Sequence, residues 1–177
     1  MQNCSRNHVK LTNTMPVSTA ANMNAVKCSL GGLVIRAYLQ YNPVAHLGRV
    51  VLIGTPNQGT PLVDRFQDHC LFELLGPTTG SLGTDGESLP RRLTTPHYPV
   101  GVIAGVVDRP LNDPLLPGPD DGLVPVESTK FDGMSDFVVV ESGHSALRYD
   151  EEVANQVIAF LKRGKFDAAG AVPASGG

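Results

Sequence analysis

The sequence has no tryptophan, and only 6% of its 177 residues are aromatic. Its three cysteines, Cys4, Cys28 and Cys70, are an odd number whose spacing fits neither a disulfide framework nor a paired-cysteine metal site. No apolar stretch approaches the ~20 residues of a membrane span, and the N-terminus carries no apolar run of signal-peptide length. These absences predict a cytoplasmic chain in a reducing compartment.

Acidic residues are missing from the first 63 positions. Residues 1–63 carry a net charge of +5, whereas residues 64–177 combine 9 basic with 17 acidic residues, a net charge of −8. The whole chain has a net charge of −3 and a pI near 5.9. It therefore lacks the basic excess that binding to a phosphate backbone requires, and we expect no nucleic-acid partner.

With 41% hydrophobic residues, the chain has the apolar content of one globular domain. Residues 1–28 differ from the rest, because they hold 5 of the 9 asparagines, none of the 19 glycines, and no sustained helical or strand period. We therefore expect an atypical, weakly structured segment over residues 1–28, a folded domain over residues 29–166, and a mobile tail over residues 167–177.

Helical and strand patterns alternate along residues 29–166. Three short runs rich in β-branched residues, 49–54, 99–107 and 137–144, predict buried strands. Residues 66–99 are predicted to form a loop-rich cap or insertion, and the proline-rich stretch that follows the second strand is predicted to form a rigid loop. The alternation predicts an α/β fold, a mostly parallel sheet with helices on both faces. In such sheets the loops that follow the strands carry the chemistry.

Two amphipathic helices frame these strands. The first is predicted over residues 29–41, ends at Asn42-Pro43, and has an apolar stripe formed by Leu30, Leu33, Val34, Ala37 and Tyr38. The second follows Asp150, a good N-cap residue, and carries the stripe Val153, Val157, Phe160 and Leu161.

Three residues in predicted loops have side chains suited to nucleophilic catalysis: Ser29 before a Gly-Gly helix start, Asp121 in the loop after the second strand, and His144 after the third. A serine hydroxyl needs an imidazole to accept its proton, and a carboxylate holds that imidazole in the required tautomer. At the start of a helix, the Leu30 N–H is the natural first donor to an oxyanion.

Four ordered segments resemble one family. The run CSLGGLVIRAYL resembles the HSxGGLVxRxYL turn and helix of bacterial lipase-like α/β-hydrolases, and GTPNQGTPLVDRF, DDGLVPVEST and the SGH after FVVV resemble its later segments. The resemblance covers about Cys28 to Phe166. It implies an α/β-hydrolase fold that cleaves small-molecule carboxylic esters through an acyl-enzyme, without metal or cofactor. Ser29 would be the nucleophile, Asp121 rather than Asp120 the acid, and His144 the base.

The chain departs from that family at two points. Lys27 stands where the family has the first glycine of its strand-to-helix turn. The family also builds several strands before its nucleophile, including the loop of the second oxyanion donor, and residues 1–28 do not resemble them. We therefore expect the N-terminal strands to be missing, the activity to be impaired, and the helix over 29–41 to expose an apolar face.

Other interpretations stay open at this point. A truncated, inactive relative would act as a binding or self-associating module through an open sheet edge, and thioesterase or acyltransferase action would use the same residues. Ser29 could be only an N-cap, Asp121 only a turn residue, and His144 only a surface histidine. Cys28 is expected to be a buried filler rather than a thiol nucleophile. His8, His46, His69 and His97 have no partners at metal-ligand spacing, and we do not expect Asp68-His69-Cys70 to be a metal site.

Overall fold

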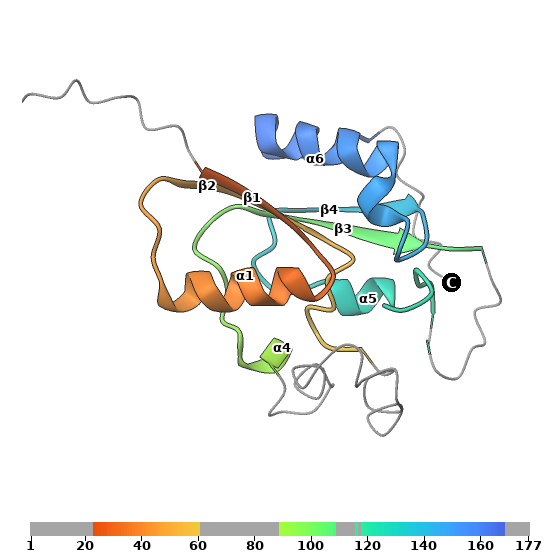
Figure 1. The fold of residues 1–177 in the computed structure, drawn as a ribbon, viewed down its shortest axis with the longest axis horizontal. Helices are drawn as coiled ribbons and strands as arrows, with labels where there is room; N and C mark the ends of the chain where they lie inside the picture. Colours follow the sequence, from red (N-terminus) through yellow and green to blue (C-terminus); the bar gives the residue numbers. More distant parts are fainter. Residues whose placement is uncertain (1–22, 61–88, 109–115, 117, 169–177) are drawn as a thin grey trace, which may run out of the picture.

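The computed structural model describes residues 23–60, 89–108, 116 and 118–168. Within them, four strands form one sheet in the order β1-β2-β3-β4, and every neighbouring pair is parallel (Figure 1). The strands are β1 (Met23–Cys28), β2 (Leu47–Ile53), β3 (Val100–Val106) and β4 (Asp136–Glu141). Because the strands are parallel, their carboxyl ends all lie at one edge of the sheet, and the chain has the predicted α/β fold.

Two long helices cover the two faces of the sheet. Helix α1 (Leu30–Tyr41) connects β1 to β2, and α6 (Glu151–Arg163) follows β4 (Figure 1). Three short helical turns lie in the connections: α4 (Leu89–Arg92), α5 (Val126–Thr129) and the 3-10 turn η2 (Leu147–Tyr149). Of the predicted cap 66–99, residues 66–88 lie outside the described residues.

The core has two layers because alternate strand residues point to opposite faces. On one face Val51, Ile53 and Ile103 pack with Phe160 of α6. On the other face Val50, Leu52, Val100 and Val102 pack with Leu39 of α1. Both faces of β2 and β3 are therefore buried, as their continuous apolar sequences predicted.

The last helix begins and ends as its sequence predicted. One Asp150 carboxylate oxygen accepts from the backbone N–H groups of Glu152 at 2.9 Å and Val153 at 3.2 Å. Gly164, with φ of 76°, ends the helix in the left-handed conformation. The prediction of a mobile tail from residue 167 is wrong at its start, because the Asp167 N–H donates to the Gln156 side chain at 2.9 Å. Residues 169–177 lie outside the described residues.

The structure corrects two expectations about the segment before Ser29. Residues 23–28, placed in a weakly structured region, form strand β1, because backbone hydrogen bonds to β2 need no particular side-chain composition. Cys28, expected to be buried, is exposed, because β1 lies at the end of the sheet. Residues 1–22 lie outside the described residues.

The apolar stripe of α1 is buried only in part, and α1 exposes an apolar face as expected. Leu33 is fully buried, whereas Val34 and Tyr38 are 56% and 54% exposed. Arg36, which the helical period did not place inside, is only 4% exposed. The helix thus turns Leu33, Arg36 and Leu39 inward and leaves an apolar stripe on its outer side.

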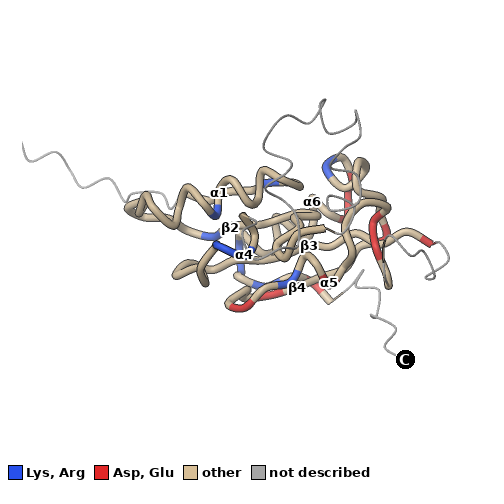
Figure 2. Tube along the Cα trace, turned by 90° about the horizontal axis from the view of Figure 1, so that it is seen from below, with Lys and Arg blue, Asp and Glu red and all other residues tan. Residues whose placement is uncertain are grey.

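Charged residues are unevenly placed on the helices. Basic residues lie on α1, α4 and the last turn of α6, and acidic residues lie on α5 and at the start of α6 (Figure 2). Within the described ranges no helix is long and apolar enough to cross a bilayer.

Candidate active site

Ser29 lies at a sharp turn between β1 and α1. Its backbone has φ of 50° and ψ of −134°, a region that residues with a side chain rarely adopt. The turn is fixed on both sides, since the Ser29 N–H donates to the Ile53 carbonyl at 2.8 Å and its own carbonyl accepts from the Gly32 N–H at 3.0 Å. This geometry projects the hydroxyl from the carboxyl edge of the sheet. The next backbone N–H along the chain belongs to Leu30, the first residue of α1.

The turn forms although Lys27 replaces the glycine of the family pattern. A Cβ atom added to Gly31 would lie 3.8 Å from the Lys27 side chain, which is an ordinary van der Waals contact. Because Gly31 has no side chain, it leaves room for the Lys27 side chain at this turn. Gly32 is packed much more closely, because a Cβ atom there would lie 2.1 Å from the Thr55 hydroxyl oxygen.

Asp121 lies in the loop between β3 and α5, with a side chain only 1% exposed. One carboxylate oxygen accepts from the backbone N–H groups of Leu123 at 3.0 Å and Val124 at 2.7 Å. These bonds hold the carboxylate in one orientation. The neighbouring Asp120 carboxylate accepts from the Gly122 N–H at 2.7 Å.

His144 connects the two other side chains. Its Nδ1 lies 2.7 Å from the second carboxylate oxygen of Asp121, and its Nε2 lies 3.0 Å from the Ser29 hydroxyl oxygen. Its backbone N–H also donates to the Asp121 carbonyl at 2.8 Å. With Asp121 ionised, Nδ1 carries the imidazole proton and Nε2 is free to accept the serine proton. The structure thus joins Ser29, His144 and Asp121 in one chain of hydrogen bonds.

Gly54, for which the sequence predicted no role, lies beside Asp121 and His144. It directly follows β2 with φ of 54°, and a Cβ atom there would lie 3.3 Å from the Asp121 carboxylate and 3.4 Å from the His144 ring. Both the positive φ and the close approach favour glycine. The signal available in the sequence was a glycine directly after a buried strand, followed by Thr-Pro.

Arg36 holds the loop that follows Gly54. Its guanidinium donates to the Asn57 side chain at 2.7 Å and lies 4.0 Å from the centre of the Phe131 ring. Asn57 in turn donates to the Thr129 carbonyl at 2.7 Å. Burial disfavours the charged guanidinium and lowers the pKa of Arg36 to about 10. This network connects α1, the loop after β2 and α5.

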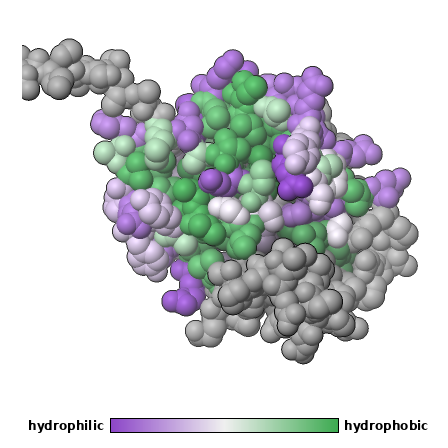
Figure 3. All heavy atoms as spheres, in the orientation of Figure 1, coloured by the Kyte–Doolittle hydropathy of each residue, from purple (hydrophilic) through white to green (hydrophobic). Residues whose placement is uncertain are grey.

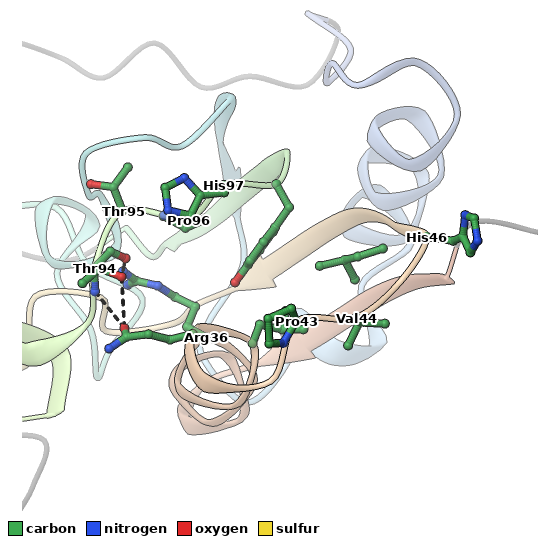
Figure 4. Close-up of a pocket in the computed structure, with 12 residues that line it drawn as sticks. Arg36, Pro43, Val44, His46, Thr94, Thr95, Pro96 and His97 are labelled. Atoms are coloured by element: carbon green, nitrogen blue, oxygen red, sulfur yellow. Dashed lines mark hydrogen bonds between the residues drawn. The ribbon is translucent and has the colours of Figure 1, made fainter.

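A cavity of about 430 Å³ lies beside Arg36, between the second half of α1 and residues 94–98 (Figure 4). In the close-up, the Arg36 side chain extends from α1 toward Thr94. Ser29, Asp121 and His144 do not line this cavity. It therefore lies apart from the chain of hydrogen bonds through Ser29, His144 and Asp121.

The remaining candidate groups stay outside the chain of hydrogen bonds. Partial burial raises the pKa of the Cys28 thiol, which disfavours the thiolate that a cysteine nucleophile needs. Among the residues that the structure describes, no three His, Cys, Asp or Glu side chains are grouped as metal ligands. Asp68, His69 and Cys70 lie outside the described residues.

Solved structures similar to this chain include two forms of one lipase. The mature form of Bacillus licheniformis lipase BlEst2 aligns with 80% of this chain at a TM-score of 0.55 and 18% identity, and its propeptide form aligns with 88% at 0.60 and 20%. The chain has a lipase-like α/β fold. It spans 65% of the mature lipase and 38% of the propeptide form. No protein-family model and no curated protein sequence matches it.

Proposed function

We propose that this chain is a serine hydrolase that cleaves carboxylic esters through an acyl-enzyme. The observation that carries the proposal is the chain of hydrogen bonds from Ser29 through His144 to the buried Asp121, with the serine at the start of a helix. A serine that served only as an N-cap would bond to the first turn of its helix, but the Ser29 side chain makes no capping bond. Likewise, a histidine with only a surface role needs no buried carboxylate.

The geometry supports the following sequence of steps. The Ser29 hydroxyl oxygen attacks the ester carbonyl while its proton passes to Nε2 of His144, and Asp121 stabilises the imidazolium that forms. The backbone N–H of Leu30 donates to the oxyanion of the tetrahedral intermediate. As the intermediate collapses, the bond to the alcohol oxygen breaks and His144 gives its proton to the leaving alkoxide. Water, activated by His144 in the same way, then releases the carboxylic acid and restores Ser29.

A phosphonate probe tests the nucleophile directly. Incubation of the full chain with a fluorophosphonate, followed by intact-mass measurement, should show one adduct that is absent from Ser29→Ala. The exposed Ser145 offers a matched control, and Ser145→Ala should label like the unmodified chain. Because a catalytic serine and its histidine act as one unit, Ser29→Ala, His144→Ala and the double variant should lose turnover of p-nitrophenyl butyrate to a similar extent. A folded chain without an adduct would instead favour the inactive relative.

We expect a slow enzyme with a narrow range of substrates. Loss of one oxyanion donor costs ~10²–10³ in kcat in serine proteases, and the N–H of Leu30 at the start of α1 is the one donor that we assign here. Turnover should therefore be measurable with p-nitrophenyl acetate and butyrate, whose leaving groups need little help, and absent with emulsified triolein. Rapid hydrolysis of triolein would show that a second donor is in place.

A further inference from the structure

Helix α1 turns a charged residue inward and apolar residues outward. Val34 and Tyr38 are exposed, and Figure 3 shows apolar atoms over the side of the molecule on which α1 lies in front. Arg36, on the inner side of the helix, is only 4% exposed. Burying a charge costs free energy unless an opposite charge accompanies it. The position of Arg36 therefore favours an anion beside its guanidinium.

No carboxylate of the described residues forms an ion pair with Arg36. The guanidinium donates to the Asn57 side-chain oxygen at 2.7 Å and, over a longer distance, to the Thr94 carbonyl at 3.5 Å, while the Phe131 ring covers it at 4.0 Å. Its Nε–H is buried and has no hydrogen-bond partner in the described part of the chain. With a pKa of about 10, Arg36 stays charged at neutral pH. Its neighbours are uncharged oxygens and a ring, so the charge has no counter-charge.

The cavity of about 430 Å³ beside Arg36 has the size of a small-molecule site. Arg36 and Thr94 lie at one end of it, and the apolar Pro43 and Val44 lie farther along (Figure 4). The described residues that line it include no aspartate or glutamate. The cavity thus joins a cationic, hydrogen-bonding end to an apolar wall, an arrangement that fits an anion with an apolar chain.

We propose that this cavity binds a small carboxylate that carries an apolar chain. The planar guanidinium matches the two oxygens of a carboxylate, and it has more N–H donors than it has partners here. In the arrangement we infer, the carboxylate accepts from Arg36 while the chain lies against Pro43 and Val44. Binding neutralises a charge that is buried without a counter-charge, and it removes apolar surface from water. An inorganic anion such as phosphate meets the same charge but leaves the apolar wall uncovered.

Chemical-shift mapping with sodium hexanoate on the isotope-labelled full chain tests the proposal. The amides of Thr94, Thr95 and Tyr98 should shift and saturate, with a Kd in the millimolar range or below. Hexanol, which has the chain without the charge, should bind at least about tenfold more weakly, since a hydrogen bond to a charged group contributes more than one to a neutral group. Shifts confined to Ser29 and His144 would place the acid at the reaction site and overturn the proposal. So would the absence of saturable shifts up to about 20 mM hexanoate.

Gln40→Glu supplies the missing charge from within the chain. Replacing Arg36 itself would also remove its bond to Asn57, so the decisive variant leaves Arg36 in place. Gln40 lies one helical turn after Arg36 and lines the same cavity. Its side-chain oxygen accepts from the Thr94 N–H at 2.9 Å, a bond that a carboxylate of the same shape can keep. The new carboxylate should compete with hexanoate for the guanidinium and raise its Kd by about tenfold or more.

Two further variants separate charge from shape. Tyr41→Glu adds the same carboxylate to the neighbouring position of α1, which is exposed and does not line the cavity, and it should leave the Kd for hexanoate within about twofold. Val44→Phe fills the apolar part and should weaken hexanoate binding although Arg36 is intact. Circular dichroism checks that each variant is folded. A folded Gln40→Glu or Val44→Phe variant that binds hexanoate as tightly as the unmodified chain would overturn the proposal.

Discussion

The two adjacent glycines at the start of α1 predict opposite effects of the same substitution. At Gly32, an added Cβ atom would lie 2.1 Å from the Thr55 hydroxyl oxygen and 2.9 Å from its Cβ atom, well inside the 3.0 Å that real Cβ contacts keep. Thr55 is fully buried and cannot move into solvent. At Gly31, the nearest atoms lie 3.8 Å away. Gly32→Ala therefore forces α1 away from the loop after β2, whereas Gly31→Ala fills open space.

The comparison of the two variants isolates this contact. Each change gains similar helix propensity, up to ~1 kcal/mol over glycine, so the propensity cancels in the difference. Overpacking a buried contact costs about 1–3 kcal/mol, and we expect the free energy of unfolding of Gly32→Ala to lie below that of Gly31→Ala by this amount. With an m-value of about 2 kcal/mol per molar urea, the midpoints should differ by roughly 0.5–1.5 M.

The assay is urea unfolding followed by circular dichroism at one fixed protein concentration, because self-association would shift the apparent stability. Thr55→Ala should restore part of the loss in Gly32→Ala, since it removes the closest atom, a buried hydroxyl that has no hydrogen-bond partner among the described residues. Equal stability of the two alanine variants would refute the packing that we assign to Gly32 and Thr55.

Three further substitutions test the site. Asp121→Asn should lower kcat for p-nitrophenyl butyrate by about 10⁴, because an amide does not hold the required tautomer of His144, and it should leave the circular dichroism spectrum unchanged. Asp120→Asn is the control. A larger loss of kcat in Asp120→Asn would show that Asp120, not Asp121, orients His144. Gly54→Ala should displace the Asp121 carboxylate and the His144 imidazole, which lowers kcat by ~10² and leaves KM little changed. Steady-state kinetics measure both constants, and an unchanged kcat would contradict this prediction. Cys28→Ser should keep kcat/KM within about tenfold; abolished turnover would place the thiol in the reaction.

Several parts of the fold were predictable because one local pattern decided them. Continuous runs of β-branched residues defined β2 and β3, which are buried on both faces whatever the order of the strands. The ends of α6 followed from Asp150 and Gly164, since capping depends on residues within one turn of the helix end. The choice of Ser29, Asp121 and His144 came from their positions after predicted strands and from the family resemblance. Parallel strands bring such loops to one edge.

Other features depended on contacts between distant residues. β1 has little apolar pattern and exists because its backbone pairs with β2. Arg36 is buried and Tyr38 exposed, against the helical period, because Asn57 and Phe131 provide partners for the guanidinium while no described element covers the outer side of α1. Gly54 acquires its place behind His144 only when β2 and the loop after β4 come together. β2, β3, α6 and the chemistry of the loops could be predicted because each depends on residues close together in the chain. The pairing of β1 and the meeting of Ser29, His144 and Asp121 depend on how distant elements pack, and so they appear only in the folded chain.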